Sequence, residues 1–138
     1  MRSGLHAALA ALFWIGLISP AFGGERDRQP HLDRSGRAQS GAASYYSAKS
    51  AGKKTASGAQ FAPNRMTAAS RTLPLGTRAK VTNAENGKSV QVTVTDRGPY
   101  ANNRILDVSP KAARHLGMKR QGVSKVKVKP VHLPKAPG

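Results

Sequence analysis

The order of apolar and polar residues predicts strands in two parts of the chain. The segment 89–95 reads S-V-Q-V-T-V-T, so three valines alternate with polar residues. A period of two residues is typical of a half-buried β-strand. The segment 123–131 repeats the pattern, with Val126 and Val128 expected inward and lysines outward. An outward row of lysines is a feature of edge strands, because it discourages pairing with a further strand.

Weaker strand patterns cover residues 77–82, 43–47 and 106–108. An Asn-Gly pair at 86–87 precedes the valine-rich strand, and this dipeptide favours a tight β-hairpin. We therefore expect segment 77–82 to pair with the valine-rich strand.

One helix is predicted over residues 111–116. Ser109 can cap its first turn, Pro110 suits the first helical position, and Gly117 can end it. Short strands, frequent Gly and Pro residues and a single short helix favour a small β-barrel over a sandwich.

The two ends of the chain differ from this core. Residues 1–23 combine a basic start, a short apolar run and small residues at Ala21 and Gly23, which is typical of a secretory signal peptide. The apolar run is too short to span a membrane. Residues 24–41 are predicted to be a disordered basic linker and 132–138 a flexible tail, which leaves 42–131 as the barrel. We therefore expect a periplasmic or secreted protein without a stable membrane anchor.

Composition narrows the chemistry. The chain has 23 Lys and Arg against 6 Asp and Glu, so its net charge is +17, and an anionic partner or surface is expected. It has no Cys, and its four His show no metal-ligand spacing, so no metal site is expected. No nucleic-acid-binding motif is present, so nucleic acid is not the expected partner.

Three acidic residues lie in the core, and each has alternative roles. Glu85 sits at the predicted hairpin tip, where we expect it to be solvated. Asp96 ends the valine-rich strand and opens D-R-G-P-Y, so it either faces a groove or serves the turn, for example by pairing with Arg97. Asp107 lies between apolar neighbours and is either a structural acceptor or a site residue.

Two adjacent tyrosines are further candidates. Tyr45 and Tyr46 face opposite sides if they lie on a strand. One is then a core residue, and the other is either a sugar-stacking platform or an incidental surface residue. His115 lies near the end of the predicted helix, where a cation suits the helix dipole. No Ser lies in a recognisable triad context, which argues against a serine hydrolase.

The core resembles the double-psi β-barrel domain of the rare lipoprotein A (RlpA) family of lytic transglycosylases. The matching blocks are A-A-S-Y-Y at 42–46, G-K-K-T-A-S-G at 52–58, M-T-A-A-S-R-T-L-P-L-G-T at 66–77, V-T-N-A-E-N-G-K-S at 81–89, V-T-D-R-G-P-Y at 94–100, and R-I-L-D-V-S at 104–109 followed by A-A-x-x-L-G at 112–117. The resemblance implies a mainly β fold: a six-stranded double-psi β-barrel with one or two short helices and a groove.

The resemblance also implies site residues. Family members carry Glu after T-A-x-G, His in T-A-A-H and Asp in D-R-G-P; here these positions are Ala59, Ser70 and Asp96. In a lytic transglycosylase the C6 hydroxyl of the muramic acid attacks its own anomeric carbon, so one acid/base can suffice and no cofactor is needed. Asp96 is the expected catalytic residue. A salt bridge to Arg97 would oppose this role, because it favours the ionised carboxylate. Ser70 is left as a possible hydrogen-bond partner of the substrate.

Two interpretations follow. The first is an endolytic transglycosylase that cleaves peptidoglycan glycan strands during wall remodelling or daughter-cell separation. The second is a non-catalytic, expansin-like barrel that binds peptidoglycan, which the Ala59 and Ser70 replacements favour. A basic secreted protein that acts on membranes is a more distant third. We expect a free monomeric barrel in each case.

Overall fold

Six strands and two short helices make up the part of the chain that the structure, a computed structural model, describes: residues 31–136. The predicted signal peptide and residues 24–30 of the predicted linker lie outside the described residues. The elements in chain order are β1 (Gln39–Tyr45), the 3-10 helix η1 (Ala48–Ser50), β2 (Thr67–Ala69), β3 (Arg78–Asn83), β4 (Ser89–Asp96), β5 (Arg104–Val108), α2 (Pro110–His115) and β6 (Ser124–His132).

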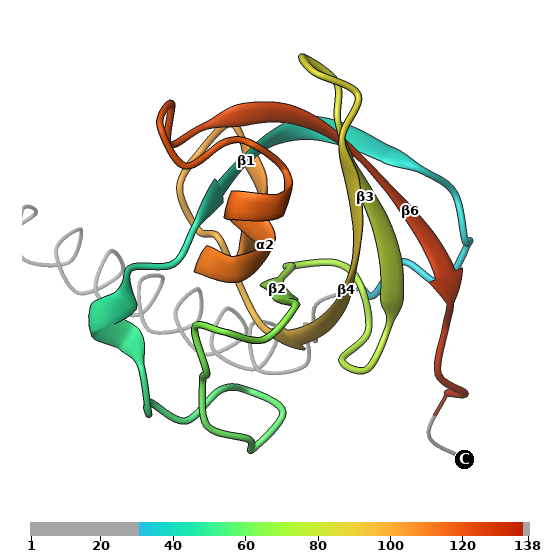
Figure 1. The fold of residues 1–138 in the computed structure, drawn as a ribbon. Helices are drawn as coiled ribbons and strands as arrows, with labels where there is room; N and C mark the ends of the chain where they lie inside the picture. Colours follow the sequence, from blue (N-terminus) through green and yellow to red (C-terminus); the bar gives the residue numbers. More distant parts are fainter. Residues whose placement is uncertain (1–30, 137–138) are drawn as a thin grey trace, which may run out of the picture. The chain divides into compact units, whose positions relative to one another are not determined.

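The strands close into a barrel in the order β1-β5-β2-β4-β3-β6 (Figure 1). Strands β1 and β5 are parallel, as are β2 and β4, whereas the other neighbours are antiparallel. This closed, mixed six-stranded barrel confirms the predicted fold class.

Buried valines from four strands, β3, β4, β5 and β6, contribute to the core of the barrel. Val81 on β3 is in register with Val90 on β4 and with Val128 on β6, and Val81 and Val128 are at most 1% exposed. Val92 and Val126 are buried to the same degree. Burying one such side chain contributes ~1.5–3 kcal/mol. The alternation seen in the sequence is therefore the inside-outside alternation of the barrel wall.

Strand β6 is not an edge strand. It pairs with β1 on one side and with β3 on the other. The prediction of an edge from its outward lysines is wrong, because closure of the barrel leaves no edge for lysines to protect.

The hairpin and the helix end support each other. Asn83 and Asn86 each donate a side-chain N–H to the carbonyl of Leu116, both at 2.9 Å. Gly87 adopts a positive φ of 76°, which the tight turn after Asn86 requires. The hydroxyl of Ser109 accepts from the N–H of Ala112 at 3.2 Å and caps α2, as predicted. α2 packs against β1 and β4.

Two elements were not predicted from the alternation. Strand β2 has only three residues, too few for a period of two to be visible, and η1 is a single short turn. Strand β1 begins at Gln39, inside the segment 24–41 that the sequence predicts to be linker. Upstream of it, the N–H of Asp33 donates to the carbonyl of Thr72 at 2.7 Å, so part of that segment lies against the barrel.

Candidate active site

The ends of three strands meet around Ala69. Asp96 is the last residue of β4, and Asp107 lies on β5. Strand β2 runs between these strands, and its Ala69 is in register with both acids. Because neighbouring strands lie ~4.8 Å apart, the topology brings two carboxylates from distant parts of the sequence to one region of the barrel.

Asp96 accepts three hydrogen bonds through its two carboxylate oxygens. The backbone N–H groups of Ala56 and Arg97 donate to Oδ1, each at 2.9 Å. The hydroxyl of Tyr46 donates to Oδ2, also at 2.9 Å. A backbone N–H can only donate, whereas a phenol can donate or accept. Oδ2 is therefore the oxygen that can hold a transferable proton, with Tyr46 as its reversible partner.

Arg97 does not direct its guanidinium to Asp96. Its Nη1 donates to the carbonyls of Ser70, at 3.0 Å, and Leu73, at 2.6 Å. The side chain therefore holds the loop that follows β2, and only the backbone N–H of Arg97 contacts the carboxylate. The guanidinium of Arg97 thus has a structural role and does not form the salt bridge with Asp96 that would oppose acid/base catalysis.

Tyr45 and Tyr46 face opposite sides, as expected of successive residues at a strand end. Tyr45 packs against the core and donates its hydroxyl to the carbonyl of Lys119 at 3.1 Å. Tyr46 is half-buried, and its ring meets Phe61 edge-on at 4.8 Å between centroids. Burial and the hydrogen bond to Asp96 raise the pKa of the Tyr46 phenol well above its usual value. Tyr46 therefore stays protonated at neutral pH.

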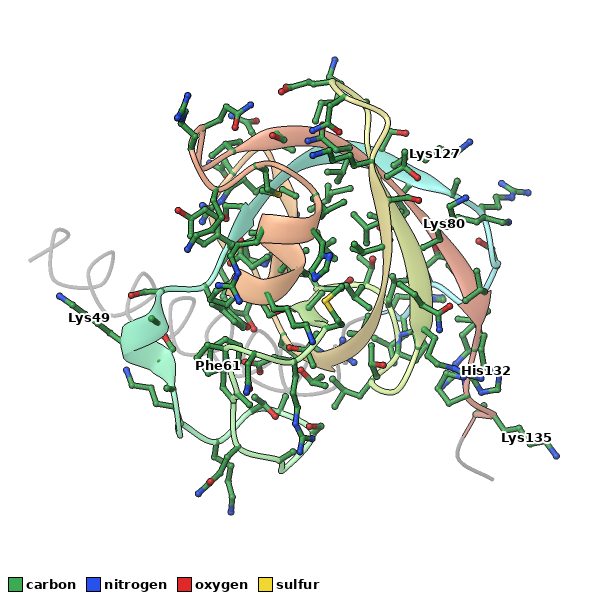
Figure 2. All side chains as sticks on the ribbon, in the orientation of Figure 1. Lys49, Phe61, Lys80, Lys127, His132 and Lys135 are labelled. Carbon is green, nitrogen blue, oxygen red and sulfur yellow. The ribbon has the colours of Figure 1, made fainter. Side chains whose placement is uncertain are left out.

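Asp96 and Tyr46 border a hollow of about 150 Å³, whose other lining residues are Ser50, Lys53, Lys54, Thr55 and Phe61. A smaller hollow of about 40 Å³ shares Thr55 and Phe61 and also touches Ala59. Figure 2 shows Phe61 on the side of the barrel away from Lys80 and Lys127. No sequence pattern singles out Thr55, Phe61 and the two lysines as site residues, although the G-K-K-T-A-S-G motif marks their loop.

The two replaced family positions have different environments. Ala59 is exposed, and its carbonyl accepts from the hydroxyl of Thr55 at 2.7 Å, which closes the loop. Ser70 is only 1% exposed, and its hydroxyl accepts from the N–H groups of Thr72 and Leu73 at 3.2 and 3.0 Å. The expectation that Ser70 bonds a substrate is therefore not supported, because its hydroxyl is buried and occupied by the turn.

Asp107 belongs to a chain of polar contacts on the barrel wall. The hydroxyl of Ser44 donates to Asp107 Oδ1, and Arg104 donates to the oxygen of Ser44 at 2.7 Å. Ser44 is 6% exposed, and Arg104 Nε is buried without a partner among the described residues. A carboxylate that is coupled to a guanidinium through a buried hydroxyl fits a structural role.

We predict that Asp107→Asn lowers the free energy of unfolding by ~1–3 kcal/mol, because the hydrogen bond from Ser44, and through it the coupling to Arg104, loses its negatively charged acceptor. Chemical denaturation measures this, with Glu85→Gln at the exposed hairpin tip as the control that should leave the midpoint unchanged. A fully stable Asp107→Asn variant that had lost glycan cleavage would instead mark Asp107 as the catalytic acid.

Among residues 31–136, no cluster of three or more potential metal ligands is found. Within the same residues, no helix is long and apolar enough to cross a membrane.

Residues 38–128 match the family model described as lytic transglycolase. A Rickettsia bellii protein named endolytic peptidoglycan transglycosylase RlpA is 52% identical over 97 residues, which is 68% of this chain and 43% of that relative. The chain belongs to the RlpA family. The RlpA protein of Neisseria meningitidis serogroup A is 47% identical over 93 residues, which is 67% of this chain and 39% of the relative. The chain thus spans less than half the length of these two RlpA relatives.

Solved structures show how widely this barrel is used. An expansin from Clavibacter michiganensis is 26% identical with a TM-score of 0.55, over 73% of this chain and 54% of the expansin. A Streptomyces papain inhibitor has a TM-score of 0.56 at 23% identity, over 70% of this chain and 96% of the inhibitor, which shows the fold alone. The fold therefore does not define the chemistry, and the RlpA assignment rests on sequence identity.

Proposed function

We propose that this barrel is an exported endolytic peptidoglycan transglycosylase, which cleaves MurNAc-GlcNAc strands and leaves 1,6-anhydro-muramic ends. The observation that carries the proposal is the Asp96 carboxylate, which borders a hollow and whose Oδ2 is bonded only to a phenol that can donate or accept. The relatives' names and the matched family model support the same reaction class.

In the proposed reaction, Asp96 is first the general acid and then the general base. Oδ2 gives its proton to the glycosidic oxygen that leaves C1 of the muramic acid. The C6 hydroxyl of the same sugar attacks C1, and its proton passes to Oδ2, which restores the acid. No water enters the product, so a second carboxylate that activates water, as in inverting glycosidases, is not required.

Two other groups position Asp96 in this scheme. Tyr46 accepts from Oδ2 when the carboxyl is protonated and donates to it when the carboxylate is ionised. The backbone N–H of Ala56 holds Oδ1 and so fixes the direction of the carboxyl. The Ala59 and Ser70 positions carry no acid or base, so we expect a slow enzyme.

The test is mass spectrometry of purified glycan strands after incubation with the protein. New 1,6-anhydro ends are expected, and reducing ends without anhydro products would contradict a transglycosylase.

A second candidate function is a barrel that binds peptidoglycan without cleaving it. The buried hydroxyl of Ser70 and the small side chain of Ala59 favour it, because neither can transfer a proton at neutral pH. Retention on sacculi with no anhydro ends, even after prolonged incubation, would support this function over the first.

Export is part of the proposal, and the apolar run and small residues before residue 24 support it. We predict that the exported protein starts near Gly24 and is recovered from the periplasm or the medium. Intact-mass analysis of the exported form measures this. A mass that still includes Trp14, or recovery from the cytoplasm alone, would contradict export.

A further inference from the structure

The outer surface of strands β3 and β6 carries a continuous group of basic side chains that the proposed reaction does not use. We call it the basic face, and its residues are Arg78, Lys80, Lys125, Lys127, Lys129 and His132, all of them exposed. On β3 and along β6 as far as Lys129 they alternate with buried core residues, and His132 follows the exposed Val131 at the end of β6. Residues two apart on a strand lie ~7 Å from each other, so the cations form a dense array.

The pairing register brings like charges together. Lys80 is directly opposite Lys129. Like charges in directly opposed positions destabilise a sheet. Lys129 relieves part of this repulsion by donating an N–H of its ammonium group to the carbonyl of Gly36 at 2.6 Å, which is a neutral partner. The face therefore keeps its positive charge at some expense to the stability of the fold.

The nearest acids are engaged by other groups. Asp33 accepts from the N–H of Ser35 at 2.9 Å and from the side-chain amide of Gln39 at 3.1 Å. Glu85 at the hairpin tip accepts from the backbone N–H of Lys125 at 3.4 Å, and not from an ammonium group. The chain's own acids therefore do not neutralise the repulsion between the basic side chains, and an anion on a binding partner would offset it.

The basic face lies across the barrel from the candidate active site. In the closed order β1-β5-β2-β4-β3-β6, β6 is opposite β2, where the two acids flank Ala69. Figure 2 shows Lys80, Lys127 and His132 on one side of the ribbon and Phe61 on the other. A glycan strand bound at Asp96 would therefore leave the basic face free for a second partner.

We propose that the basic face binds the carboxylates of peptidoglycan stem peptides on a neighbouring strand, so that the barrel holds the wall at two places. The inference rests on the proposed function for its substrate. Four of the six residues are lysines, which are hydrated point charges that need no fixed geometry and suit anions on flexible peptides. Membrane-binding surfaces add several large apolar or aromatic side chains to their cations, whereas Val131, which is 55% exposed, is the one exposed large apolar side chain on β3 and β6.

A second attachment changes retention more than turnover. Contacts between exposed charges are screened over ~8 Å at physiological ionic strength, so this attachment is weak and sensitive to salt. Joined to the groove contact, it acts at a high effective concentration and slows release from the wall.

The test uses two triple variants of the full chain that lose the same charge. Lys80→Gln with Lys125→Gln and Lys127→Gln removes half of the basic face but keeps the Lys129 contact. Lys49→Gln with Arg114→Gln and Arg120→Gln removes three exposed cations elsewhere. At low salt we expect the first variant to lose roughly tenfold in retention on sacculi, and the second to lose much less. High salt should lower the retention of the wild type on sacculi to nearly that of the first variant.

Three further measurements identify the partner. Both variants should cleave soluble, peptide-free glycan strands at the wild-type rate, and the first should be at least as heat-stable as the wild type, since Lys80 no longer faces Lys129. On sacculi stripped of stem peptides, the wild type should bind no better than the first variant.

If both triple variants lost retention on sacculi equally, the net charge of the protein and not the basic face would account for binding, which would overturn the proposal. If the wild type bound sacculi without stem peptides as well as intact sacculi, the peptide carboxylates would not be the anions that the basic face binds. Vesicles of anionic phospholipid that bind the wild type but not the first variant, with sacculus retention unchanged, would assign the face to a membrane. If the wild type cleaves no glycan, the proposed function fails, while the retention comparison still decides the role of the face.

Discussion

The Asp96→Asn variant is expected to lose glycan cleavage by at least 10²–10⁴-fold, the contribution of a general acid–base group. The substitution keeps the shape of the side chain, and the amide oxygen can still accept from Ala56 and Arg97. The amide nitrogen would face Tyr46, whose hydroxyl can reverse and accept. The barrel should therefore stay folded while the transferable proton is gone. Anhydro ends counted by mass spectrometry, beside a thermal melt, measure both effects.

Tyr46→Phe is the matched variant for this experiment. It keeps the edge-on contact with Phe61 and removes only the hydroxyl that meets Oδ2. A smaller loss of cleavage than in Asp96→Asn, with a shifted pH profile, is expected if Tyr46 positions the carboxyl. Cleavage by Asp96→Asn at the wild-type rate would place the acid elsewhere, and Asp107 would then be the first residue to examine.

The Ala59→Glu variant should produce more anhydro ends than the wild type, on the order of 10²-fold more if the new carboxylate contributes as a general acid–base group does. Ala59 is exposed and borders the small hollow that shares Thr55 and Phe61 with the larger one, so a longer side chain fits without repacking the core. Ala59→Gln has almost the same shape without the charge and should not show the gain.

Adding Ser70→His rebuilds the family's third position, but the structure makes this step harder. The hydroxyl of Ser70 is buried and accepts two backbone N–H bonds, so a larger ring must displace the turn that it holds. The double variant is therefore expected to gain activity at some loss of stability. If the wild type, Ala59→Glu and the double variant all bind sacculi but yield no anhydro ends, the binding function is correct.

The sequence by itself determined the barrel wall and its family. Val92, Val94, Val126 and Val128 alternate with polar residues, and that period is local, so it can be read without knowing which strands pair. The hairpin at Gly87 and the cap at Ser109 are local too, because each depends on residues within one turn. The ordered motifs identified the RlpA family and singled out Asp96 on its D-R-G-P sequence.

Only the tertiary structure decided which groups surround Asp96 and what the outward lysines face. Tyr46 and Ala56 lie 50 and 40 residues away from Asp96 in the chain, so no local pattern shows that they bond its carboxylate. The direction of the Arg97 guanidinium depends on carbonyls after β2, and β2 itself is too short to show a period. In the sequence, the row of lysines on β6 is typical of an edge strand. In the closed barrel, however, β6 pairs with a neighbouring strand on each side. Contacts between distant segments form only when the strands close into the barrel. They depend on the whole fold, so no local sequence pattern shows them.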